Sequence, residues 1–151
     1  MAIDIRGLAP LLEVFDMATS VHFYRDVLGF EVASTSAAGE NFGWALLRLK
    51  GIELMLNTAY EDRQRPPSPD LPRVAAHSDT TLFFGCADLD GAYTLLRDNG
   101  LDVQEPTVAP YGMKQLSVTD PDGYRLCFQW PASQQTVDEW RKRYGFEPEI
   151  A

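Results

Sequence analysis

The chain contains one supersecondary pattern twice. In the first copy a helix begins after Asp16 and ends at Gly29, and an extended segment follows from Phe30. Asp16 suits the N-cap, because its carboxylate can accept hydrogen bonds from the free N–H groups of the first turn. Glycine takes positive φ at the C′ position without strain, which suits Gly29 to ending the helix. Apolar residues recur on one helical face at Met17, Val21, Tyr24 and Leu28.

The second copy of this pattern begins at Asp88, which corresponds to Asp16. Further along, the segment GIELML that starts at Gly51 corresponds at the same offset to GYRLCF, which starts at Gly123. Two long copies indicate a pair of similar β-α-β-β-β modules. They do not indicate a solenoid, which needs at least about three shorter repeats.

Strand, turn and proline signals divide the chain into segments. We expect module one over 8–57, a linker over 58–79, module two over 80–131 and a C-terminal helix over 133–145. The polar, proline-rich linker is typical of a mobile connection or of the rim of a site. In the tail, Thr136 and Glu139 fit a capping box at the start of the last helix. The whole chain, 1–151, is expected to form a single domain.

The charge balance limits the partners. Thirteen Lys and Arg against 22 Asp and Glu give a formal net charge of −9. Such a chain repels nucleic acid and anionic membranes, and it attracts cations by long-range steering. Neither a signal peptide nor an apolar run near the ~20 residues of a membrane span is visible, so we expect a cytoplasmic protein. Cys86 and Cys127 are expected to be reduced, buried strand residues.

Two motifs resemble a known family. S-x-x-F-Y-x-x-x-L-G-F runs from Ser20 to Phe30, and DPDG runs from Asp120 to Gly123. Over about Leu8–Trp130 the chain resembles the vicinal oxygen chelate superfamily, also called the glyoxalase/bleomycin-resistance/dioxygenase family. The resemblance implies an α+β fold of two tandem β-α-β-β-β modules. Their curled mixed sheets carry the helices outside and face each other around a cavity, which a dimer often completes.

Strand periodicity predicts which side chains line this cavity, because alternate residues face opposite sides of a sheet. The predicted ligand-binding residues of module one are Glu13, Trp44, Arg48, Glu53, Met55 and Asn57. Those of module two are Phe83, Met113, Gln115, Arg125, Cys127 and Gln129, with Thr81, Gly85 and Ser117 beside them. The sign of the ligand's charge stays open. Either arginine would bind a carboxylate, and either glutamate an amine.

Metal-dependent members of the family place His, Gln or Glu ligands at four inward positions. The corresponding residues here are Ala9, Met55, Thr81 and Cys127, and none is a His or a carboxylate. A catalytic divalent metal in this family needs about three such ligands, so we expect no cofactor. The alternative is a relocated metal held by His77 with Glu13 and Glu53. His22 lies off the apolar stripe of its helix and is expected in solvent.

Three functions follow from these patterns. The first is a metal-free protein of the bleomycin-resistance type that sequesters a small ligand, such as a cationic aromatic antibiotic, between aromatic and thioether walls. The second is a divergent metal-dependent glyoxalase-like lyase or dioxygenase. The third is a scaffold whose cavity is filled by side chains. Since exposed sheet edges must be covered, a homodimer is expected.

Overall fold

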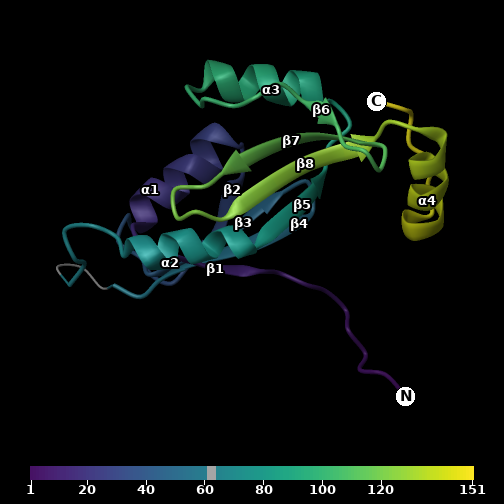
Figure 1. Cartoon of the computed structure of the whole chain (residues 1–151). Helices are drawn as coiled ribbons and strands as arrows, with labels where there is room; N and C mark the ends of the chain where they lie inside the picture. Colours follow the sequence, from purple (N-terminus) through teal and green to yellow (C-terminus); the bar gives the residue numbers. More distant parts are fainter. Residues whose placement is uncertain (61–63) are drawn as a thin grey trace. The chain divides into compact units, whose positions relative to one another are not determined.

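The computed structural model describes residues 1–60 and 64–151. The chain divides into two compact units, a first unit of Met1–Leu71 and a second unit of Pro72–Ala151. Each unit contains one four-stranded sheet, with strand orders β1-β4-β3-β2 and β5-β8-β7-β6 (Figure 1). In both sheets the first pair of strands is parallel and the other pairs are antiparallel. The two copies read from the sequence therefore have the same topology, and the α+β fold is confirmed.

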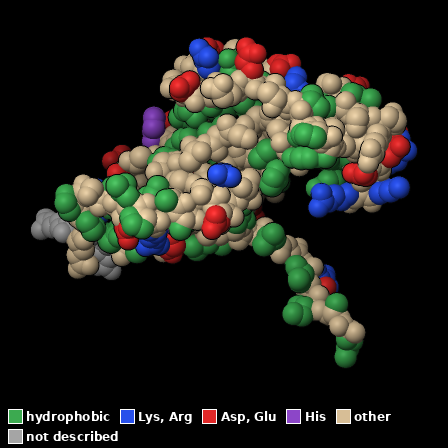
Figure 2. Space-filling model, in the orientation of Figure 1, with side chains coloured by type: hydrophobic (Ala, Val, Ile, Leu, Met, Phe, Trp, Pro, Cys, Tyr) green, Lys and Arg blue, Asp and Glu red, His purple; other side chains and the backbone are tan. Residues whose placement is uncertain are grey.

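The elements of the first unit follow the expected order. They are β1 (Leu11–Val14), α1 (Met17–Val21), a π-helical turn (His22–Val27), β2 (Glu31–Thr35), β3 (Trp44–Leu49) and β4 (Ile52–Thr58). Asp16 is the N-cap of α1, as expected, and accepts hydrogen bonds from Ala18 N at 3.2 Å and Thr19 Oγ1 at 2.8 Å. Residues 1–10 form no helix or strand, and hydrophobic side chains are exposed along them (Figure 2).

The core of the first unit lies between α1 with its π-helical turn and one face of the sheet. Leu12 and Val14 of β1 are buried, and so are the β3 and β4 residues of the same face, Ala45, Leu47, Leu54 and Leu56. Tyr24 is fully buried, with its ring edge-on to Phe23 and Phe30. The opposite face carries Glu13, Trp44, Met55 and Asn57, which are half-buried, as strand alternation predicts.

The second unit repeats this plan and adds helices at both ends. Its elements are α2 (Leu71–Ala76, whose first residue is the last of the first unit), a 3-10 turn (His77–Asp79), β5 (Thr81–Gly85), α3 (Leu89–Asp98), β6 (Thr107–Val108), β7 (Met113–Thr119), β8 (Arg125–Pro131) and α4 (Gln134–Tyr144). α3 lies over one face of the sheet (Figure 1), and its Leu89 and Leu96 are buried, as are Leu116, Val118 and Leu126 of that face. No helix among the described residues has the length and apolar character to cross a membrane.

Three details differ from the sequence-based predictions. The segment 58–79 was expected to be a linker only, but it contains α2. The N-cap of α4 is Ser133, and its capping box is completed by Thr136 at the N3 position, so the box expected to start at Thr136 is wrong by one turn. Cys86 lies just beyond β5 and is half-buried, whereas Cys127 is buried in β8 as expected.

The turn between β7 and β8 holds α2 in place. The buried Asp120 carboxylate accepts hydrogen bonds from the backbone N–H groups of Asp122 and Tyr124, both at 2.9 Å. Gly123 has a φ of 89°, and a Cβ there would lie inside contact distance of the Val74 carbonyl oxygen in α2. The turn therefore needs glycine both for its backbone conformation and for the close approach of this helix.

We predict that Gly123→Ala lowers the free energy of unfolding by about 2–4 kcal/mol, because it adds a steric clash to the strain of positive φ. Urea unfolding measures the loss. Gly39→Ala is the matched control, since Gly39 has a φ of 85° and no atom close to its position. Equal losses in the two variants would contradict the packing of α2 against the turn.

Candidate ligand-binding site

The second unit has an open hollow of about 320 Å³ on one face of its sheet. Lys114 of β7 pairs with Asp90 of α3 at 3.0 Å, so the even-numbered residues of β7 face α3. Apart from Val118 and Leu126, the strand residues that line the hollow are odd-numbered, so the hollow lies on the other face. We call it the unit-two hollow. Its lining residues are Thr81, Phe83, Tyr111, Gln115, Ser117, Val118, Thr119, Arg125, Leu126 and Cys127.

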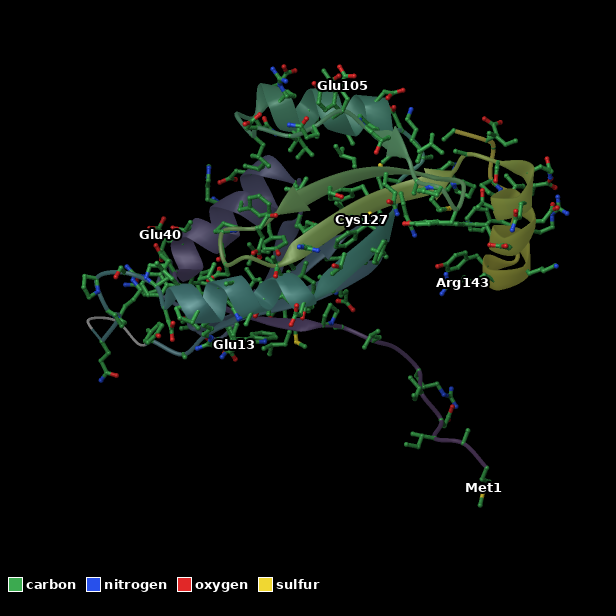
Figure 3. The ribbon with its side chains drawn as sticks, in the orientation of Figure 1. Met1, Glu13, Glu40, Glu105, Cys127 and Arg143 are labelled. Atoms are coloured by element: carbon green, nitrogen blue, oxygen red, sulfur yellow. The ribbon has the colours of Figure 1, made fainter. Side chains whose placement is uncertain are left out.

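Strand register places these side chains in rows across β5, β8 and β7. The first row is Thr81, Arg125 and Thr119, and the second is Phe83, Cys127 and Ser117. The third is Gly85, Gln129 and Gln115. The guanidinium of Arg125 thus lies between two hydroxyl groups. The next row holds the exposed phenyl ring of Phe83, and the third row holds the two amides of Gln129 and Gln115. Figure 3 shows Cys127 on β8, the central strand of this face.

The polar groups of the hollow differ in how they are satisfied. Gln115 Nε2 donates to the Tyr111 hydroxyl and, at 3.1 Å, to Gln129 Oε1, so this amide is held from two sides. Arg125 is exposed, and within 1–60 and 64–151 its guanidinium has no hydrogen-bond or ion-pair partner. Its donors are therefore available to a ligand.

Cys127 is unsuited to nucleophilic chemistry. Burial raises the pKa of the Cys127 thiol, and a hydrogen bond with Ser117 opposes this only in part. The reactive form of a cysteine is the thiolate, which a raised pKa disfavours at neutral pH. Cys127 thus contributes an uncharged sulfur to the second row.

The predicted site residues of module one lie on the half-buried face of the first unit. Their register places Glu13 beside Asn57, Trp44 beside Asn57, and Arg48 beside Glu53. Asn57 Nδ2 lies 2.9 and 3.2 Å from the two Glu13 carboxylate oxygens, and Arg48 Nη2 lies 2.9 Å from Glu53 Oε2. Glu13 is thus paired with an amide and Glu53 with a guanidinium, both on this face.

The positions expected for metal ligands carry poor donors. Thr81 offers a hydroxyl, Cys127 a protonated thiol, and Met55 a thioether on the other sheet. Among residues 1–60 and 64–151, no group of three His, Cys, Asp or Glu side chains is placed to hold a metal ion. The side chains at these positions do not fit the divalent metal of the family.

Glu13 and Glu53 of the first unit lie too far apart to share one relocated metal ion. Glu13 pairs with Asn57, four residues along β4 from Glu53, which puts the two glutamates about 13 Å apart along the sheet. His77 belongs to the second unit, where its Nδ1 donates to the Asp122 carbonyl oxygen at 2.7 Å and its ring stacks on Tyr124 at 4.1 Å. His22 is exposed, as expected, and pairs with Asp26 at 2.9 Å.

Of the predicted module-two residues, four line the hollow: Phe83, Gln115, Arg125 and Cys127. Met113 is buried opposite Pro131, and the half-buried Gln129 lies opposite Gln115; neither is among the residues that line the hollow. Sequence reasoning missed Thr119 and Tyr111. Extending the alternation of β7 by one more step would have found Thr119. Tyr111 lies in the loop before β7, where no periodicity identifies it.

Several solved structures have this fold. TnmS3, an antibiotic binding protein from Streptomyces sp. CB03234, is 21% identical, with a TM-score of 0.62 over 86% of this chain and 99% of that one. A bleomycin-binding protein complexed with bleomycin is 20% identical, with a TM-score of 0.62 over 83% and 98% of the two chains. A bleomycin resistance determinant encoded on the transposon Tn5 is 20% identical, with a TM-score of 0.64 over 85% and 100%.

Identities this low establish the shared fold and leave the ligand open. Among curated proteins, none matches the sequence. The family model of the Glyoxalase/Bleomycin resistance protein/Dioxygenase superfamily matches residues 9–128, which is most of the chain. The chain therefore belongs to this superfamily, as its two motifs had suggested.

Proposed function

We propose that the protein binds a small aromatic molecule non-covalently and without a metal ion, in the unit-two hollow. The observation that carries the proposal is the composition of that face. It offers a ring, hydroxyls, an oriented amide and an available guanidinium, while its one thiol is held protonated. Such a surface can recognise a ligand, but it lacks an activated nucleophile.

The size and shape of the hollow support this role. Its volume of about 320 Å³ lies near the lower end of the range of roughly 300–1,000 Å³ typical of small-molecule sites. Phe83 is 58% exposed and Tyr111 is 60% exposed, so both rings have free surface for stacking. Apolar area of this kind is costly to leave in water, and a planar ligand would cover it.

The ligands of two proteins of the same fold favour sequestration of an antibiotic. TnmS3 is an antibiotic binding protein, and another protein of the same fold is complexed with bleomycin. We infer that this protein captures an antibiotic of that general kind and releases it unchanged. The net charge of −9 would draw a cationic antibiotic towards the molecule at long range. The groups inside the hollow determine which charge is bound at contact.

We also propose a homodimer. The strand orders leave β1 and β2 at the edges of the first sheet and β5 and β6 at the edges of the second. Unpaired edges favour association with another strand, and natural proteins cover them. The candidate contacts are 8–10, the proline-rich segment and α4, where Leu8, Leu71 and Tyr144 are exposed.

Sedimentation at micromolar concentration is expected to give about twice the chain mass of 16.9 kDa, because covering these edges and apolar side chains favours association. A single species at the monomer mass would contradict the dimer. It would leave the ligand site of the second unit unaffected, since every lining residue belongs to one chain.

A neutral aromatic probe tests the binding function. We expect 2-naphthamide to bind saturably, as measured by isothermal titration calorimetry. Phe83→Ala should weaken its binding about five- to tenfold, because a stacking ring contributes about 1–1.5 kcal/mol. Phe146→Ala is the matched control, since Phe146 is also about half exposed and packs in an aromatic cluster of the C-terminal segment. Equal loss in both variants would place the probe outside the hollow.

A further inference from the structure

We propose that the ligand of the unit-two hollow carries a carboxylate, which binds Arg125 while its planar ring lies against Phe83. This inference rests on the proposed function and specifies the chemical class of the ligand. It addresses the question that the sequence left open, because both arginines and both glutamates of the predicted cavity were candidates for the charged contact.

The other arginines that the structure describes have partners, and this singles out Arg125 as the group that binds the ligand. Arg48 pairs with Glu53 at 2.9 Å, and Arg65 with Asp16 at 2.8 Å. Further acidic or aromatic partners occupy Arg6, Arg25, Arg97, Arg141 and Arg143, and Arg73 also has a partner. Among the arginines of 1–60 and 64–151, Arg125 alone has a guanidinium without such a contact. The chain has 22 acidic residues that could pair with an arginine, so the lack of such a contact at Arg125 among the described residues sets it apart from the other arginines.

The charge of the lining gives the second step. Arg125 is the one residue of the hollow's lining that is charged at neutral pH, so the local charge is positive although the whole chain is negative. Burial raises the pKa of the neighbouring Cys127 thiol, which keeps a competing thiolate from forming beside the guanidinium. A carboxylate entering the hollow therefore meets one cation and no fixed anion among the lining residues.

The arrangement of the rows gives the third step. Thr81 and Thr119 flank Arg125 on the adjacent strands and can donate hydroxyl hydrogen bonds to the same ligand oxygens. A guanidinium presents a planar fork of donors that matches the two oxygens of a carboxylate. Phe83 lies one row further on, so a short aromatic carboxylate spans both contacts.

The carboxylates that would have bound an amine are satisfied inside the protein. Asn57 donates to Glu13, and Arg48 pairs with Glu53, both in the first unit. Binding a cation there would first require these contacts to be broken. The contacts of the hollow and of the first unit thus both favour an anionic ligand.

Three probes of similar shape test the inference at pH 7. They are 2-naphthoate, its uncharged analogue 2-naphthamide, and the cation 2-naphthylmethylammonium. We expect calorimetry to show that the carboxylate binds at least about tenfold more tightly than the amide, which corresponds to one charge-assisted hydrogen-bond pair. In Arg125→Met this preference should disappear, and Arg125→Lys should retain part of it.

Arg97→Met is the control, because it removes the same charge from α3, where Arg97 contacts Tyr93. Its carboxylate preference should equal that of the unchanged protein. Equal binding of all three probes, or tighter binding of the ammonium, would overturn the anionic ligand and leave the binding function standing. A carboxylate preference that survives Arg125→Met would overturn the role of Arg125. Failure of all three probes to bind would overturn the proposed function as well.

Discussion

The pairing of β8 with β5 on one side and β7 on the other determines the whole second unit. Because side chains alternate along a strand, this register sends Leu126 towards α3 and Arg125 and Cys127 towards the hollow. A slip of one residue would exchange the two faces, burying the guanidinium and exposing the core leucine. The Asp120–Gly123 turn fixes the register between β7 and β8, and so the same short segment supports both stability and the site.

The two copies of the module have kept their topology and diverged on their open faces. Glu53 of the first copy corresponds to Arg125 of the second, and Glu13 corresponds to Gly85. In the first unit the charges pair within the sheet, and the face becomes an internally satisfied surface. In the second unit the corresponding glycine has no side chain, and the corresponding arginine has no partner among the residues that the structure describes. The difference in chemistry between the copies thus comes from a few positions on an unchanged fold.

Much of this fold was visible in the sequence. The repeat, the Asp16 cap and the alternation of β4, β7 and β8 are local patterns, and they predicted the sheets and which face each residue joins. α2 was missed because it has no buried apolar stripe, and the sequence alone does not show the contact of Val74 with the Gly123 turn. Met113 has the alternation expected of a residue that faces the hollow. The backbone next to it is covered by α4, where Thr136 Oγ1 donates to the Gly112 carbonyl oxygen.

The sequence predicted which strand positions form the ligand site, but it did not predict which charged side chains pair with one another. Sequence alone gives the candidates for inward charges, but it does not say which of them neutralise one another. That depends on the inter-strand register, which places Arg48 opposite Glu53 and leaves Arg125 opposite two threonines. Whether a charged group can bind a ligand depends on its neighbours in the folded sheet. In this respect the hollow differs from the face of the first unit.

The central claim is capture of an aromatic molecule, without metal, on the open face of the second sheet. Amide chemical-shift mapping tests it most directly, with 15N-labelled protein dialysed against chelator and titrated with 2-naphthamide. The account predicts saturable shifts concentrated on β5, β7 and β8, at Phe83, Ser117 and their neighbours. Shifts concentrated on Glu13, Trp44 and Met55 of the first unit, or binding that appears only after a divalent metal is restored, would contradict it.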